Sequence, residues 1–174
     1  MNENYIPEVI NDFNVYKKGS RFVGVSGEVS LPDMDAITAT IEGAGVLGQY
    51  ETAIIGMFGS MKMDIPFRML EDDVFSLMDP TELLDLTLRG SQQYTRRDTA
   101  ELDYLGMRVV VRGKMLSFKG GKLKKGEPMD PSVSIELLYI LIEIDGKTKL
   151  ELDKLNSKYI VNGKDVLAKV RNQC

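Results

Sequence analysis

Apolar and polar residues alternate along most of the chain, which is the pattern of β-strands with one buried face. The most apolar run lies at 132–146, where both alternating sets are apolar and only Glu136 and Glu143 interrupt the stretch from Ile135 to Ile144. A membrane span needs about 20 apolar residues, and the β-branched content of this run argues against a helix. We therefore predict a strand covered on both faces, the second face by a packed sheet or by another subunit.

The same alternation predicts about eight strands, with turns at Lys17–Gly19, Asp145–Gly146 and Asn162–Gly163. A change of period predicts a short helix at 70–78 and a terminal helix at 165–172. Residues 150–156, at the start of the last expected strand, fit a short helix equally well. The expected strands cover residues 13–16, 23–31, 37–42, 60–68, 84–94, 104–118, 132–144 and 150–161.

Two segments fall outside this pattern. Residues 1–10 contain Pro7, which blocks regular structure, yet their apolar side chains predict an N-terminal arm that docks on a surface. Residues 43–59 carry five glycines among apolar side chains. The letters GAGVLG at 43–48 match the dinucleotide pattern GxGxxG, but no buried strand precedes them and no helix follows. We predict a long hairpin loop that becomes ordered against a neighbour.

Length and composition restrict the number of domains and the classes of partner. The 174 residues fit one domain, and the single cysteine, Cys174, excludes an intrachain disulfide. The first residues show no secretory signal, and no run predicts a membrane anchor. A net charge of −4 argues against tight binding of nucleic acid. The lysines of the loop at 119–125 lack stacking aromatics and P-loop spacing, so they predict a solvated loop or, second, contact with an acidic partner.

Catalysis and cofactors are disfavoured. The chain has no histidine and no GxSxG motif, so only carboxylate chemistry remains. Glu136 and Glu143 are an odd number of residues apart, on opposite faces of the predicted strand. The triplet at 71–73 fits a helix N-terminus better than a metal site. We predict a protein that is not an enzyme and holds no cofactor or metal.

Eight segments in a fixed order carry a family resemblance. They are FNVY (13–16), VGVSGEVSLPDM (23–34), IEGAGVLGQYE (41–51), PFRMLEDDVFSLMDP (66–80), LTLRGSQQY (86–94), MRVVVRG (107–113), GEPMDPSVSIELLYILIEIDGK (126–147) and LELDKLNSKYIVNGKDVLAKVR (150–171). Together they resemble the major tail tube protein of contractile-tailed bacteriophages, and the resemblance spans nearly the whole chain.

The resemblance implies a mainly β fold of two packed antiparallel sheets, a sandwich or barrel, with a short central helix and a C-terminal helix. It implies hexameric rings that stack into a hollow tube in the virion tail, assembled in the host cytoplasm. The expected partners are further copies of the chain and the sheath, tape-measure, baseplate and tail terminator proteins, with DNA only in transit. Phage-like bacteriocins and type VI secretion tubes are similar, so a DNA-free particle remains an alternative.

Six copies at −4 each would give a ring of −24, which lets a polyanion slide rather than bind. A monomeric ligand-binding barrel of lipocalin type is the alternative from another class.

Replacing Phe58 with Asp is expected to stop tube growth without unfolding the monomer. The residues expected at subunit contacts are Tyr5, Ile6, Leu47, Ile54, Ile55, Met57, Phe58 and Met129, and those expected to face the lumen are Glu42, Lys62, Asp64 and Arg68.

Overall fold

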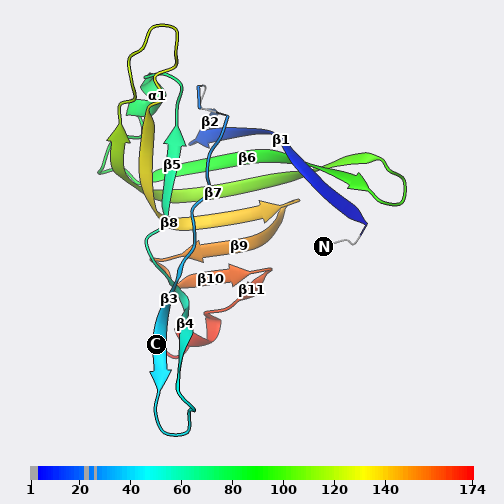
Figure 1. The fold of residues 1–174 in the computed structure, drawn as a ribbon, viewed down its shortest axis with the longest axis vertical. Coiled ribbons are helices and arrows are strands. Elements are labelled where there is room, and N and C mark those ends of the chain that lie inside the picture. Colours follow the sequence, from blue (N-terminus) through cyan, green and yellow to red (C-terminus); the bar gives the residue numbers. More distant parts are fainter. Residues whose placement is uncertain (1–3, 22–23, 26) are drawn as a thin grey trace.

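A computed structural model describes residues 4–21, 24–25 and 27–174. Strands dominate these residues, and the two helices are single turns, α1 (Asp72–Phe75) and α2 (Ala168–Arg171). Figure 1 shows the strands as arrows in chain order. They are β1 (Tyr5–Lys17), β2 (Ser20–Arg21), β3 (Ala36–Glu42), β4 (Gln49–Phe58), β5 (Lys62–Pro66), β6 (Leu84–Arg96), β7 (Leu102–Lys119), β8 (Ser132–Ile144), β9 (Lys147–Asp153), β10 (Lys158–Val161) and β11 (Lys164–Asp165).

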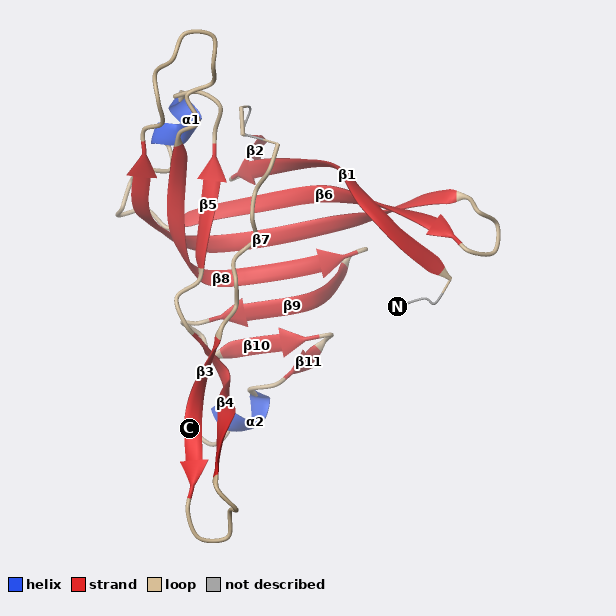
Figure 2. Ribbon diagram, viewed as in Figure 1, coloured by secondary structure: helices blue, strands red, loops and turns tan. Residues whose placement is uncertain are grey.

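Two antiparallel sheets form, as the resemblance implies. The large sheet has the order β11-β10-β9-β8-β7-β6-β1-β2, and β5 pairs with β8 beside this path. The small sheet consists of β3 and β4 alone. Figure 2 shows the small sheet as a hairpin that projects from the rest of the molecule.

The large sheet is strongly bent, and the bend lies in its two central strands, β7 and β8. The pairing of β7 with β8 shifts register at Arg112/Gly113 and again at Met115/Ser117, and such bulges bend a strand. A Cβ on Gly113 would lie 2.1 Å from the carbonyl oxygen of Glu136, so only glycine fits this approach. Beyond the bend, β5 and the first part of β8 run across the direction of β6 and β9 (Figure 1).

The core fills the angle of this bend. Alternate side chains of the β5 region point into it, as the sequence predicts, and each is at most 1% exposed. Val74 and Leu77, in and just after α1, close one end of the core. One face of β8 joins this core, while Leu138 and Leu141 on its other face stay half-buried. The core residues are Val15, Met61, Met63, Ile65, Phe67, Val74, Leu77, Leu84, Leu86, Leu88, Val109, Val111, Val133, Ile135, Leu137, Ile140 and Leu152.

The strand predicted at 23–31 does not form in the described residues. Val25 makes one isolated bridge to Phe67, and residues 27–35 have no regular structure; positions 22–23 and 26 lie outside the description. Val25 and Val29 nevertheless pack against the core. The alternation therefore reflects an extended segment that packs on the core by its side chains without a neighbouring strand.

Other boundaries also differ from those predicted. The expected arm is strand from Tyr5 onward, because an edge strand tolerates a proline and β1 bulges directly after Pro7. The expected loop at 43–59 is a turn only over 43–48, since β4 begins at Gln49. The last expected strand divides into β9 and β10, and both predicted helices shorten to one turn.

Candidate assembly surfaces

The β3–β4 hairpin carries the largest uncovered group of apolar side chains. It projects at one end of the longest axis of the molecule (Figure 1). Two strands are marginally stable alone in water, so such a ribbon usually lies on another surface. The turn at its tip places Leu47 fully in solvent, at 108% of its reference exposure.

Strand pairing sorts the hairpin into two faces. Ile41 lies opposite Tyr50, and Ala39 lies opposite Thr52, so one face is mostly apolar. Alternation adds Ile37 and Ile54 to this face. Thr38, Thr40, Glu42, Gln49, Glu51 and Ala53 form the other, mostly polar face. The four large residues of the apolar face, Ile37, Ile41, Tyr50 and Ile54, are 36–55% exposed.

The pairing between the two strands is interrupted near the base. The register shifts between Ala36/Phe58 and Thr38/Ala53, which leaves Ile54–Met57 opposite the single residue Ile37. Ile55 and Met57 in this stretch are exposed. An apolar strand segment without a ladder partner is suited to contact with a further chain.

The base of the hairpin is held by the C-terminal part of the chain. The Phe58 ring meets the Tyr159 ring edge-on at 5.2 Å between centroids, and Lys154 Nζ donates a hydrogen bond to the Gly59 carbonyl at 2.6 Å. Leu167 packs so tightly on Gly56 that a Cβ there would lie 2.5 Å from its Cδ1. Phe58 is thus half-buried against the body, so Phe58→Asp would disturb folding and assembly together.

The ends of the large sheet are the second candidate surface. In the described chain, β1 pairs with β2 only at Tyr16 and Lys17, so its edge from Tyr5 to Val15 is open. Ile6, Val9 and Ile10 on this strand are 43–57% exposed. At the opposite end, β11 is two residues long and pairs only with β10.

The remaining predicted contact residues are partly covered. Tyr5 is half-buried, with its ring edge-on to Tyr94 and 5.8 Å from the Arg96 guanidinium carbon. Met129 is half-buried as well, and its backbone N–H donates a hydrogen bond to the Arg68 carbonyl at 2.9 Å. These two residues therefore offer less free surface than the hairpin.

The four residues predicted to face the lumen do not come together. Lys62 and Asp64 are exposed on β5, on the side away from the core, and Arg68 follows β5. Glu42 ends β3, and Figure 1 shows that this end lies far from β5. The arrangement gives no shared surface that includes Glu42 and the other three.

On the face of the large sheet opposite the core, charged side chains pair across neighbouring strands. Arg112 contacts Asp85 at 2.8 Å, and Arg108 contacts Glu143 at 2.6 Å. The Arg112 guanidinium also lies 4.8 Å from the ring centre of Tyr139. Burial, followed by the charge of Glu151, raises the pKa of Tyr139 to about 12, so the phenol stays protonated. On this face, opposite charges therefore lie side by side.

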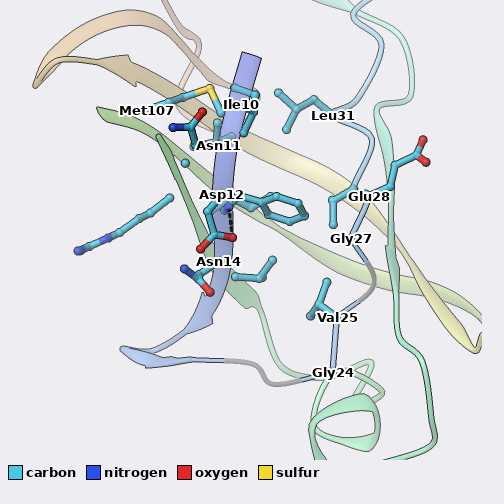
Figure 3. Close-up of a pocket in the computed structure, with 17 residues that line it drawn as sticks. Ile10, Asn11, Asp12, Asn14, Gly24, Val25, Gly27, Glu28, Leu31 and Met107 are labelled. Atoms are coloured by element: carbon cyan, nitrogen blue, oxygen red, sulfur yellow. Dashed lines mark hydrogen bonds between the residues drawn. The ribbon is translucent and has the colours of Figure 1, made fainter. Parts of the chain in front are cut away.

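A groove of about 780 Å³ separates β1 from the segment 24–31 (Figure 3). Ile10 and Leu31 lie on its two sides, with Met107 near the same end. The backbone N–H of Phe13 donates to Asp12 Oδ1 at 2.8 Å within its wall. The lining of the groove is largely apolar. Among the described residues, neither the groove nor any other place holds a group of acidic, histidine or cysteine side chains that could bind a metal ion.

A sequence model of the family described as phage tail tube protein FII matches residues 7–174. The chain belongs to this family. The tail tube protein of Escherichia phage P2 is 28% identical over 167 residues, covering 95% of this chain and 96% of that protein. The major tail tube protein of Serratia phage KSP20 is 24% identical over 161 residues, covering 92% and 91%. The resemblance seen in the sequence is confirmed, and the chain is a structural tail tube subunit of the virion tail.

A solved structure confirms the fold of this family member. It is the sheath/tube terminator of an extracellular contractile injection system, which matches with a TM-score of 0.57 at 14% identity over 79% of this chain and 97% of that one. The described residues include no helix long and apolar enough to cross a bilayer.

Sequence reasoning missed three residues of the apolar hairpin face. Ile37, Ile41 and Tyr50 were not among the expected contacts, although the first two stood in a predicted strand. The signal was present, because 37–41 and 50–54 both alternate in phase with one apolar face. Reading 43–59 as a loop hid this pattern.

Proposed function

We propose that the chain forms hexameric rings that stack into the inner tube of a contractile tail. The observation that carries this proposal is the large sheet with two open ends, one of which is the apolar edge of β1. Open edges are ready to pair with another chain, and closing the sheet across copies removes them. Ring closure by repetition of one such contact is a heterologous interface.

The lumen of this tube carries the tape-measure protein and then DNA. A sheath surrounds the tube, and baseplate and terminator proteins close its ends. The charge of −4 per chain supports passage of a polyanion without retention. The subunit has no catalytic role, and its residues act by packing against copies of the chain.

The first test is the solution mass and appearance of the purified chain. Light scattering with negative-stain microscopy is expected to show rings of six 19.5 kDa chains, or tubes built from them. Concentrated protein that remains a single-chain particle, alone and with its sheath and baseplate, would contradict the proposal.

The edge contact has its own test. Val9→Lys places a charge on the open edge of β1 and is expected to prevent ring formation while the monomer stays folded. Leu83→Lys is the matched control, because Leu83 is also exposed and lies outside the β1 edge and the hairpin. Rings in the Val9 variant would exclude this edge from the contact.

The particle type is decided by its contents. Nuclease-protected DNA in purified particles is expected for a phage tail attached to a filled head. Particles that carry this tube and contain no DNA would instead favour the bacteriocin-like or secretion device.

A further inference from the structure

The groove beside β1 reaches the hydrophobic core (Figure 3). Its lining includes the core residues Val15, Leu88 and Val109. Ile10 and Leu31 lie on its two sides. Its volume of about 780 Å³ falls within the range of sites in which proteins hold whole ligands. The groove can therefore take an apolar side chain together with its neighbours in the chain.

The two walls of the groove are acidic. Residues 4–16, which include most of β1, and residues 24–35 contain no lysine or arginine. The acidic residues of these two stretches are Glu8, Asp12, Glu28, Asp33 and Asp35. Within the described residues, the lining has one basic side chain, Arg89, whose guanidinium carbon lies 5.5 Å from the centre of the Tyr16 ring. An apolar segment with positive charges beside it therefore complements the groove.

The loop between β7 and β8 has this complementary chemistry. We call residues 119–127 the basic loop. Its first seven residues contain no acidic side chain, and Leu123 lies among four lysines, which are Lys119, Lys122, Lys124 and Lys125. Leu123 is 88% exposed, so it does not fill the groove of its own chain.

The basic loop is ordered by its own contacts. The backbone N–H of Lys122 donates a hydrogen bond to the Met129 carbonyl at 2.8 Å, and that of Glu127 donates to the Lys124 carbonyl at 3.2 Å. The Glu127 carboxylate also pairs with Lys122 and Lys124. Leu123 is thus presented to solvent by an ordered turn, and a preformed turn loses less conformational entropy when it binds.

The charges around Leu123 distinguish it from the two other most exposed large apolar side chains of the described residues, Leu47 at 108% and Leu155 at 73%. Leu47 lies on the β3–β4 hairpin, which contains glutamates and no basic residue, so acidic walls repel it. Leu155 directly follows Asp153 and Lys154, whose charges cancel. Charge complementarity therefore selects Leu123 for the groove.

We propose that the basic loop of one copy inserts Leu123 into the groove beside β1 of the next copy in the same ring. Figure 1 shows β1 and the loop beyond α1 in the half of the molecule opposite the hairpin, so copies placed side by side hold loop and groove at one level. The groove adjoins the open edge of β1, and the loop extends the proposed ring contact. Each copy offers one loop and one groove, so the contact repeats around the ring. This inference rests on the proposed ring.

The first test places a charge on the inserted side chain. Leu123→Asp brings a carboxylate to an apolar groove with acidic walls, and it is expected to raise the protein concentration needed for ring formation at least about tenfold. Leu155→Asp is the matched control, because it makes the same change at an exposed leucine outside the loop, and it should form rings like the wild type. Light scattering and negative-stain microscopy are the readouts, and thermal unfolding checks that each variant is folded.

The second test traps the contact directly. In a Cys174→Ser background, Leu123→Cys/Leu31→Cys puts one thiol on the basic loop and one on the wall of the groove. A mild oxidant is expected to join neighbouring copies by disulfides, and non-reducing gels should show a ladder of bands that ends at six chains. Leu155→Cys/Leu31→Cys in the same background is the control and should run as single chains.

Two results would overturn this inference while rings of the wild type uphold the proposed function. One is ring formation by Leu123→Asp at the wild-type concentration. The other is the absence of disulfides between copies in the Leu123→Cys/Leu31→Cys variant. If the wild type forms neither rings nor tubes, the proposed function fails, and this inference fails with it.

Discussion

The β5 region and the β3–β4 hairpin have the same alternating sequence pattern and opposite environments. Met61, Met63, Ile65 and Phe67 are at most 1% exposed. The equivalent apolar side chains of the hairpin are 36–55% exposed. Alternation therefore shows that a strand face will be buried, but it does not show whether the same chain buries it.

The contrast extends to what holds each region in place. The core buries its β5 side chains between two layers of the bent sheet. The hairpin depends on a few contacts at its base, chiefly Phe58 with Tyr159 and Leu167 over Gly56. Most of its surface is thus free for other copies, and substitutions there should separate assembly from folding.

The largest expected effect comes from the core. Phe67→Ala removes a buried ring and should lower the free energy of unfolding by about 3–5 kcal/mol. Tyr50→Ala, on the exposed hairpin face, should change it by no more than about 0.5 kcal/mol. Urea unfolding of both monomers measures this. Equal losses in the two variants would remove the distinction between the regions.

The next effect concerns the base of the hairpin. Gly56 has φ +77°, so Gly56→Val should lower the free energy of unfolding by about 1–2 kcal/mol through backbone strain, and it also collides with Leu167. In a Leu167→Ala background the collision is absent, so Gly56→Val should there cost only the backbone strain. If Gly56→Val costs nothing relative to Leu167→Ala alone, Gly56 is needed only for space.

A third prediction compares two neighbouring residues of β3. Ile41→Asn replaces a side chain of the apolar face, and Thr40→Asn replaces one of the polar face. Both should alter the free energy of unfolding by no more than about 0.5 kcal/mol. Tube growth, followed by light scattering, should fall only for Ile41→Asn. Similar growth curves for the two variants would mean that the apolar face stays in solvent in the tube.

The sequence was sufficient where local chemistry decides structure. Asp145–Gly146 and Asn162–Gly163 form the predicted turns, with positive φ at all four residues, and the strands around them follow as expected. The alternation of β5 also identified the buried residues correctly. These features depend on residues close together in the chain.

The sequence was insufficient where a distant contact decides. Val25 and Val29 alternate like a strand, yet within the described residues they pack on the core and form only the single bridge from Val25 to Phe67. Phe58 was expected at a subunit contact, but Tyr159, about a hundred residues later, half-buries it. The surfaces between copies depend on a second chain, so their residues remain proposals.

The smallest predicted effect separates folding from assembly by pH. Asp153 ends β9, and its carboxylate accepts hydrogen bonds from the backbone N–H groups of Leu155 and Asn156, both at 3.0 Å, and from the Asn156 side chain at 2.7 Å. Burial raises the pKa of Asp153, but the bonds from Asn156 and Leu155 outweigh it, so the pKa falls below its ordinary value of 3.8.

A lowered pKa in the folded state stabilises the fold above the ordinary pKa, and this contribution disappears as the pH falls through the folded-state value. Urea midpoints measured from neutral pH down through 3.8 should therefore decline more steeply for the wild type than for Asp153→Asn. The turn at Asp153 lies in the body of the subunit, so a substitution on the hairpin should not change the difference between Asp and Asn at position 153. The same comparison made in the Ile41→Asn variant checks this. Parallel curves for the wild type and Asp153→Asn would mean that these hydrogen bonds do not favour the charged carboxylate.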